Sequence, residues 1–149
     1  MINLKNYTST IDAHLSMSRI EQYLVKAGAT DISKKYDQGV CRAITFRMLI
    51  NNEPLFFQLP AKVDLCFNVL WKQIKKPQDG TKEKIMIQAQ RTAWKIVSDW
   101  VEIQLSMILL EQAEPMQVFL PYAYDPASDE TFYDKMKKSG FKALLGPAK

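Results

Sequence analysis

The sequence contains few of the residues that bend, crosslink or interrupt a protein chain. Its 149 residues include five glycines and seven prolines, too few for a linker-rich or low-complexity protein. Two cysteines without a Cys-x-x-Cys pair, and a single histidine, make a structural zinc site unexpected. Long apolar runs are missing, and the first residues do not resemble a secretory signal. We therefore expect a soluble cytoplasmic protein.

The motifs of common enzyme classes are also missing. There is no glycine-rich dinucleotide or phosphate loop, no Gly-x-Ser-x-Gly and no His-Glu-x-x-His. His14 lies in a polar context just ahead of a predicted helix, which is typical of a surface or capping residue. Cys41 and Cys66 fall in predicted core segments, where buried free thiols are favoured over a disulfide between them. We predict a protein that is not an enzyme and that holds no metal or cofactor.

The composition that is present fits one globular domain. Hydrophobic residues make up 47% and charged residues 24%, which is close to globular averages, and 149 residues are enough for one core. The net charge is +4, and residues 1–76 hold 11 Lys and Arg against 6 Asp and Glu. Such a bias can favour phosphate backbones, but it is also common in proteins that bind no nucleic acid.

Hydrophobic periodicity predicts an α+β fold in which a short antiparallel meander of about three strands packs against helices. The strands are expected at residues 29–36, 40–50 and about 55–59, with a tight turn at Asn51-Asn52. In the second strand Ile44 and the alternate apolar residues share one face. Arg42 falls on that same side, and Arg47 on the opposite, exposed side.

Helices are expected before and after the meander. A capping-box pair, Ser18 and Glu21, predicts that the first helix begins at Ser18 and ends near Gly28. Further helices are expected over residues 61–74 and 82–113, with a short one capped by Ser128 or Asp129 that runs to Lys138. Residues 1–149 should form a single domain, with 1–12 and 141–149 as candidates for loose ends. Residues 4–11, before the first helix, are expected to form either a short edge strand or an irregular arm.

The expected long helix, residues 82–113, is apolar on two sides. One stripe contains Trp100 and the other contains Trp94, so the helix must be surrounded by partners and should form the axis of the core. A narrow polar stripe remains between them. It is either a solvated face with weak ion pairs or a functional site, such as two carboxylates that hold a cation. Its residues are Arg91, Lys95, Asp99 and Glu102.

Two surfaces are candidates for binding. Basic residues could contact phosphates, with Trp71 and Phe56 as nearby aromatics, although the sequence pattern from Lys72 to Lys84 favours a solvated loop. Aromatic residues near the C-terminus could anchor a protein partner or pack against the long helix. The nucleic-acid candidates are Lys34, Lys35, Arg47, Lys72, Lys75, Lys76, Lys82 and Lys84, and the partner-binding candidates are Tyr122, Tyr124, Phe132 and Tyr133.

Three segments resemble a group of small uncharacterised proteins from bacteriophages and bacterial mobile elements. They are Phe57-Gln-Leu-Pro-Ala61, the Ala-Trp…Asp-Trp-Val-Glu stretch within residues 91–105, and Val118-Phe-Leu-Pro-Tyr122. The resemblance covers most of the chain and implies a genomic setting, in the cytoplasm of a bacterial host. It supplies no catalytic residues.

Three functions remain open at this point. The first is a non-enzymatic phage or mobile-element accessory protein that binds a nucleic acid or a nucleoprotein complex. The second is a protein–protein interaction module, such as an inhibitor of a host defence enzyme. The third, and the least favoured, is a small enzyme that uses carboxylates such as Asp99 and Glu102. The sequence leaves the oligomeric state and the identity of the partner open.

Overall fold

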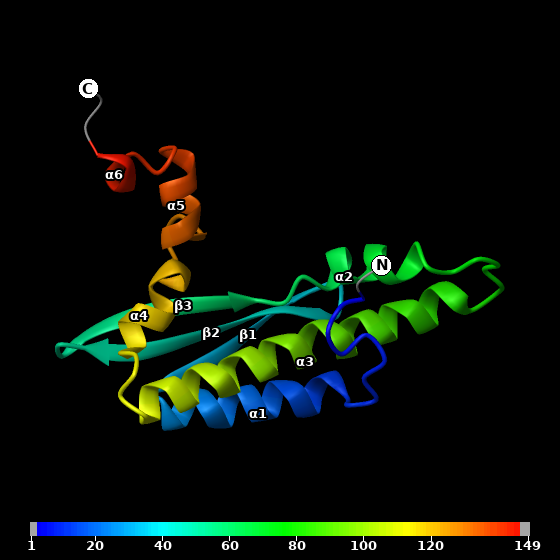
Figure 1. Cartoon of the computed structure of the whole chain (residues 1–149), viewed down its shortest axis with the longest axis horizontal. Coiled ribbons are helices and arrows are strands. Elements are labelled where there is room, and N and C mark those ends of the chain that lie inside the picture. The colour runs from blue at the N-terminus through cyan, green and yellow to red at the C-terminus, as the bar shows by residue number, and fades with distance from the viewer. Residues whose placement is uncertain (1–2, 147–149) are drawn as a thin grey trace.

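The computed structural model describes residues 3–146 and has the predicted α+β fold (Figure 1). A three-stranded antiparallel sheet packs against helices, and one long helix runs along the molecule. The elements are α1 (Ala13–Lys26), β1 (Asp31–Asp37), β2 (Val40–Ile50), β3 (Glu53–Pro60), α2 (Val63–Trp71), α3 (Thr81–Leu109), α4 (Pro115–Phe119), the 3-10 turn η1 (Leu120–Tyr122), β4 (Tyr124–Asp125), β5 (Glu130–Thr131), α5 (Phe132–Lys138) and α6 (Lys142–Leu145).

The meander is ordered β1-β2-β3, and the turn between β2 and β3 is the predicted one. Asn51 and Asn52 have φ angles of 52° and 67°, a left-handed conformation that asparagine tolerates. Pro54 lies in β3, an edge strand, as a residue without a backbone N–H requires. The alternating apolar residues of β2 and β3 point into the core, where the rings of Phe46 and Phe57 stack with centroids 5.1 Å apart.

The predicted orientation of Arg42, on the same side of β2 as Ile44, is wrong because a β-bulge interrupts the alternation. The register between β1 and β2 shifts after Lys35, which pairs with Ala43, so that Tyr36 pairs with Cys41. Arg42 is the extra residue, and simple alternation fails there. Cys41 is therefore buried with Ile44, while Arg42 forms an ion pair with Asp64 at 2.7 Å.

The first helix begins earlier than predicted. Asp12 is its N-cap and accepts a hydrogen bond from the backbone N–H of His14 at 2.8 Å. The proposed capping box at Ser18 is wrong, because Ser18 lies inside α1. Burial of Ala13 and Met17 favours the longer helix. His14 is an exposed residue of its first turn rather than a residue ahead of the helix.

The long helix is the axis of the core, as predicted, but it runs from Thr81 to Leu109 rather than from 82 to 113. Its N-cap is Gly80, whose φ of 84° is a left-handed conformation that suits glycine. α1 and α2 pack against it. Trp94 is fully buried and donates a hydrogen bond to the Cys41 carbonyl oxygen at 3.2 Å. Trp100 is only half-buried.

The second helix is shorter than the predicted span of residues 61–74. Pro60 still belongs to β3, and the backbone N–H of Ala61 donates to the Arg42 carbonyl oxygen at 2.9 Å. This bond extends the sheet and delays the helix until Val63. After Trp71 the backbone closes in tight turns, in which the N–H groups of Gln73 and Ile74 donate to carbonyls three residues earlier.

The segment before α1 is an irregular arm rather than an edge strand, and side chains of α3 hold it. The Thr92 hydroxyl donates to the Asn6 carbonyl oxygen at 2.9 Å, and Gln88 donates to the carbonyl oxygens of Tyr7 and Ser9. Residues 3–12 are thus attached to the core, contrary to the expected loose end. Residues 1–2 lie outside the described range.

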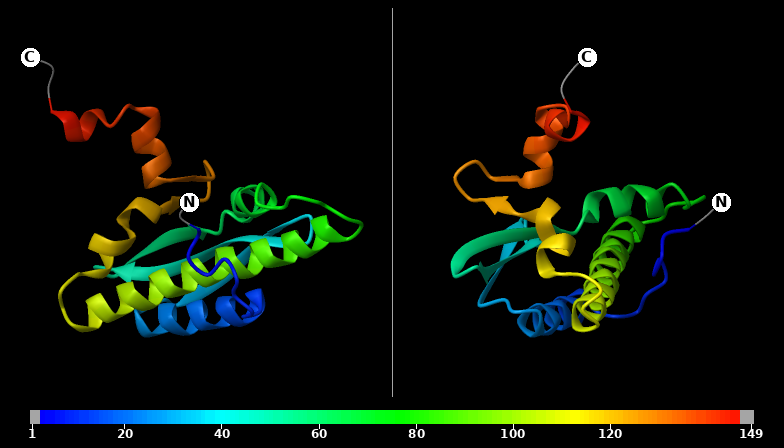
Figure 2. Two further views of the ribbon diagram at one scale, coloured as in Figure 1. Left: turned by 45° about the vertical axis from the view of Figure 1, so that its right-hand side comes forward. Right: turned by 60° about the vertical axis from the view of Figure 1, so that its left-hand side comes forward.

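α5 and α6 form a C-terminal arm that stands away from the sheet and the long helix (Figures 1 and 2), whereas β4 packs against β3. The β4–β5 hairpin leads into α5, which is capped by Thr131 rather than by Ser128 or Asp129. The ring of Phe141 lies 5.8 Å from that of Tyr133, and α6 follows within the expected loose end; residues 147–149 are outside the described range. Within residues 3–146, no helix combines the length and apolar character needed to cross a membrane.

Candidate nucleic-acid interface

The connection between α2 and α3 gathers five of the predicted basic residues at one end of the molecule. We call this group the lysine tip. Three of its lysines follow α2 and two lie in the first turn of α3, so the antiparallel packing of these helices brings both sets to the same end (Figure 1). All five side chains belong to exposed residues. The lysine tip consists of Lys72, Lys75, Lys76, Lys82 and Lys84.

The lysine tip has a net positive charge that is not neutralised by contacts. Asp79 and Glu83 are the only acidic residues between Lys72 and Lys84. None of the five lysines forms an ion pair with another residue in the described part of the chain. The positive end of the α3 helix dipole lies at the same place. These charges are therefore available to an anion.

The other three predicted basic residues are engaged elsewhere. Lys34 pairs with Glu21 at 3.0 Å, Lys35 with Asp129 at 3.2 Å, and Arg47 with Asp31 at 2.8 Å. The hydrogen bond to Glu21 raises the pKa of Lys34. These residues lie on β1 and β2 rather than at the lysine tip. The predicted set of eight basic residues is thus two groups, and only one of them lacks ion-pair partners among residues 3–146.

One of the two predicted aromatic neighbours lies beside the lysine tip. Trp71 is the last residue of α2, directly before Lys72, and its half-buried ring stacks on Phe67 with centroids 5.7 Å apart. Phe56 instead pairs with Arg47 across β2 and β3 and belongs to the sheet surface. Proteins that bind single-stranded nucleic acids combine lysines, which contact the phosphates, with aromatic rings, on which the bases stack.

The polar stripe of α3 is occupied by structural contacts. Asp99 forms an ion pair with Lys95 and accepts a hydrogen bond from the Asn6 side chain at 2.9 Å. Burial raises the pKa of Asp99, but these hydrogen bonds outweigh it and the net shift is downward. Glu102 accepts a hydrogen bond from the Tyr23 hydroxyl at 2.6 Å, which raises the pKa of Tyr23.

The carboxylates of Asp99 and Glu102 therefore hold separate partners on the N-terminal arm and on α1. No group of three or more potential metal ligands occurs among the residues described. Arg91 has no ion-pair partner within residues 3–146 and is half-buried. The stripe fastens the N-terminal arm and α1 to the long helix.

The four C-terminal aromatic candidates do not form one surface. Tyr122 packs edge-on against Trp100, 5.6 Å between ring centroids, as the packing alternative predicted. Tyr122 and Tyr133 line one hollow of about 460 Å³, together with Lys62 and Lys137. A smaller hollow is lined by Tyr124, Phe132 and neighbouring residues. The side chains of Phe132 and Tyr133 are 41% and 50% exposed, which leaves only these two as accessible anchors.

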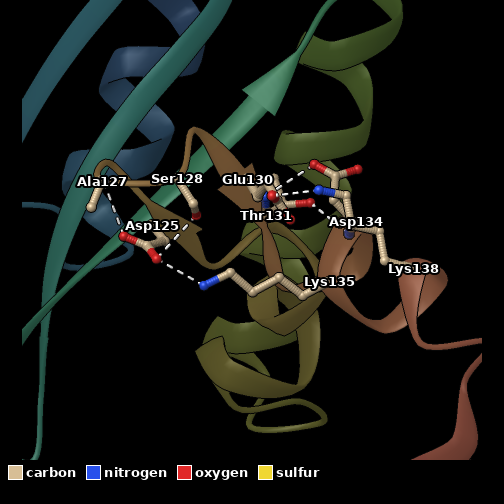
Figure 3. Close-up of polar contacts among 8 residues, drawn as sticks. All are labelled: Asp125, Ala127, Ser128, Glu130, Thr131, Asp134, Lys135 and Lys138. Atoms are coloured by element: carbon tan, nitrogen blue, oxygen red, sulfur yellow. Dashed lines mark hydrogen bonds and ion pairs between the residues drawn. The ribbon is translucent and has the colours of Figure 1, made fainter.

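Polar contacts shape the β4–β5 hairpin and its junction with α5 (Figure 3). Asp125 accepts hydrogen bonds from the Ala127 backbone N–H, the Ser128 hydroxyl and Lys135. The bond from Lys135 is the main cause that lowers the pKa of Asp125 to about 2. Lys138 pairs with Glu130 at 2.6 Å. These contacts fix the direction in which the arm leaves the domain.

The sequence did not reveal an apolar hollow between α2 and α3. Leu65 and Val69 line it from α2, and Ile96 and Val97 line it from α3. Its volume is about 290 Å³, and Lys62 is one of its lining residues. The sequence feature that could have indicated this hollow is the i, i+4 spacing of Leu65 and Val69. These residues form a second apolar stripe on a helix that buries its first stripe in the core.

The two cysteines are free thiols in the core, and burial raises the pKa of both. They lie on β2 and α2, and neither belongs to the lysine tip. Raised pKa values and burial make them poor nucleophiles.

Comparison with known proteins gave no match to a family model, to a curated protein or to a solved structure.

Proposed function

We propose that this chain is a non-enzymatic accessory protein of a phage or mobile element, and that its lysine tip binds the phosphate backbone of a nucleic acid. The observation that supports the proposal is the separation of the basic residues into two groups. The five lysines of the tip are exposed and have no ion-pair partner in the described range, whereas Lys34, Lys35 and Arg47 each have one. Charges already neutralised by carboxylates contribute little to phosphate binding.

The chemistry of the tip fits phosphates better than it fits bases. Lysine is a flexible point charge, which suits a phosphate backbone, whereas base recognition favours planar arginine, asparagine or glutamine side chains. The tip contains no arginine. Binding should therefore depend on the density of backbone charge and only weakly on sequence. Trp71 could add stacking on an unpaired base, so single-stranded targets should bind at least as well as duplexes.

A pair of matched variants tests the proposal. The tip variant K75Q/K76Q/K84Q and the sheet variant K34Q/K35Q/R47Q each remove three positive charges and take the net charge from +4 to +1. Binding to labelled single-stranded and duplex DNA and RNA is measured by fluorescence anisotropy at low salt. The tip variant should bind at least about tenfold more weakly than the wild type, with each contact contributing through counterion release. The sheet variant should bind like the wild type.

The comparison separates local contacts from overall charge. Equal losses in the two variants would mean that net charge alone governs binding, and the proposed site would be wrong. Absence of wild-type binding to all four nucleic acids at low salt would reject direct binding. Circular dichroism should be used to check that both variants are folded, because the sheet variant loses three ion pairs.

A second candidate is a protein-binding module, such as an inhibitor of a host defence enzyme. It is favoured by the hollow that the exposed Tyr133 lines, because an exposed aromatic side chain at a concave site is a common anchor of protein interfaces. A partner captured from bacterial lysate should then be lost with the variant Y133S and retained with the tip variant. The opposite pattern would favour the lysine tip.

A further inference from the structure

The four most exposed large apolar side chains of residues 3–146 occur as two adjacent pairs. Leu109 and Leu110, at the end of α3, are 67% and 73% exposed. Leu144 and Leu145, in α6, are 75% and 77% exposed. Single exposed leucines are ordinary, but adjacent pairs present a larger apolar surface to water. The pairs lie on different parts of the molecule, one at the foot of the long helix and one on the C-terminal arm (Figures 1 and 2).

The charges beside the two pairs are opposite. Glu111 directly follows the first pair and Glu114 comes three residues later, and they are the only charged residues between Ile103 and Ala123. We call Leu109, Leu110, Glu111 and Glu114 the acidic corner. Neither glutamate has an ion-pair partner among the residues that the structure describes.

The second pair has a basic surrounding. The segment from Lys135 to Gly146 contains four lysines and no acidic residue. Lys135 and Lys138 are paired with Asp125 and Glu130. Lys137 and Lys142 have no ion-pair partner in the described range, and together with Leu144 and Leu145 we call them the arm end.

We propose that the arm end of one copy of this chain binds the acidic corner of a second copy. Each side offers two exposed leucines and two unpaired charges, of opposite sign on the two sides. The leucines supply the apolar contact, and the lysine–glutamate pairs determine which surface meets which. The two surfaces differ, so the contact is heterologous, and each copy retains a free corner or arm end for a further copy unless the assembly closes.

Charge repulsion also makes the apolar hollow between α2 and α3 a less favourable binding site for the arm end. The hollow between α2 and α3 could accept two leucines, but Lys62 is one of its lining residues and would repel Lys137 and Lys142 of a second copy. The acidic corner has no lysine or arginine in its sequence neighbourhood from Ile103 to Ala123. The contact is small, so we expect weak, concentration-dependent association rather than a permanent dimer.

Charge exchange in the full-length chain tests this proposal. The corner variant E111K/E114K and the arm variant K137E/K142E should each remain monomeric, because their two surfaces carry charges of the same sign. An equimolar mixture of the two variants should associate again, since each basic corner meets an acidic arm end and each acidic corner meets a basic arm end. The fourfold variant with both exchanges should associate by itself. The four altered residues, Glu111, Glu114, Lys137 and Lys142, are all exposed, so folding should persist, as circular dichroism can verify.

Sedimentation equilibrium gives the readout. For a dissociation constant near 1 mM, the weight-average mass of the wild type should rise about 1.5-fold between dilute solution and about 1 mM protein. The leucine variant L144S/L145S should abolish the rise. The control variant L65S/I103S, which removes two other leucine or isoleucine side chains of 62% and 57% exposure, should retain it.

Three results would overturn the proposal. One is a wild type that stays monomeric up to about 1 mM, because the proposed contact should already be half-occupied at a concentration near its dissociation constant. Another is association of the single charge variants at the wild-type level. The last is an equal loss in the leucine variant and its control. None of these results bears on nucleic-acid binding by the lysine tip, which involves different residues.

Discussion

Trp94 should contribute far more to stability than Trp100, although the two lie six residues apart on the same helix. Trp94 is fully buried, and its indole N–H donates to the Cys41 carbonyl oxygen at 3.2 Å, beside the β-bulge. Trp100 is half-buried, and its ring contacts Phe119 and Tyr122 edge-on. Its N–H has no hydrogen-bond acceptor among the residues that the structure describes. The substitution of each by Phe retains an aromatic ring and compares the two environments.

The magnitude follows from two losses at Trp94. The hydrogen bond to Cys41 contributes about 1 kcal/mol. The smaller ring of Phe loses buried apolar area and leaves a cavity, which costs about 1–2 kcal/mol in a site that cannot fully collapse. The variant W94F should therefore lose about 2–3 kcal/mol, a large part of the 5–15 kcal/mol typical of a domain. The variant W100F should lose about 1 kcal/mol or less, because its site is open to water.

Equilibrium urea unfolding, followed by far-ultraviolet circular dichroism, measures both losses without relying on tryptophan fluorescence. The midpoint of W94F should fall while the slope with denaturant stays unchanged, since the same surface is exposed on unfolding. A loss below about 1 kcal/mol in W94F, or equal losses in the two variants, would refute the assignment of Trp94 to the core and of Trp100 to its edge.

Three further predictions concern other parts of the chain. Because hydrogen bonds from Lys95 and Asn6 lower the pKa of Asp99, its stabilising effect should be complete above its ordinary pKa and disappear as the pH falls through the lowered value. The wild type should thus exceed D99N by roughly 1–2 kcal/mol at pH 7 and approach it near pH 2, in urea unfolding at each pH. The variant G80A should lower the free energy of unfolding by about 1 kcal/mol, because φ is +84° and no neighbour clashes with a Cβ atom there; an unchanged midpoint would contradict this. Cys41 and Cys66 should resist iodoacetamide in the folded protein and react in urea, because burial raises the pKa of both thiols; rapid native labelling, detected by mass spectrometry, would contradict their burial.

The parts of the fold that depend on local periodicity could be predicted. Alternation of apolar residues identified β2 with its bounds, and Asn51-Asn52 identified the turn after it, because a positive φ limits the residue types that fit. The two apolar stripes identified the long helix. What failed was decided by tertiary contacts. Ser18 satisfies a capping-box pattern as well as Asp12 satisfies an N-cap, and only the burial of the preceding turn distinguishes them.

The candidate site divides in the same way. The lysine tip could be predicted as one group because a short connection joins its two helices, and closeness in sequence ensures closeness in space. The separation of Lys35 from this group could not be predicted, since its partner, Asp129, lies 94 residues away along the chain. The same holds for Asp99, whose contact with Asn6 depends on how the N-terminal arm crosses α3. Long-range ion pairs decide which charges remain available.

The salt dependence of nucleic-acid binding tests the central claim most directly. For duplex DNA, the slope of log K against log salt concentration has a magnitude of about 0.9 per neutralised phosphate. The variant K75Q/K76Q/K84Q should therefore reduce the magnitude of the wild-type slope by up to about 2.7, whereas K34Q/K35Q/R47Q should leave it unchanged. Equal slopes for the wild type and the tip variant would contradict the claim that the lysine tip binds phosphates.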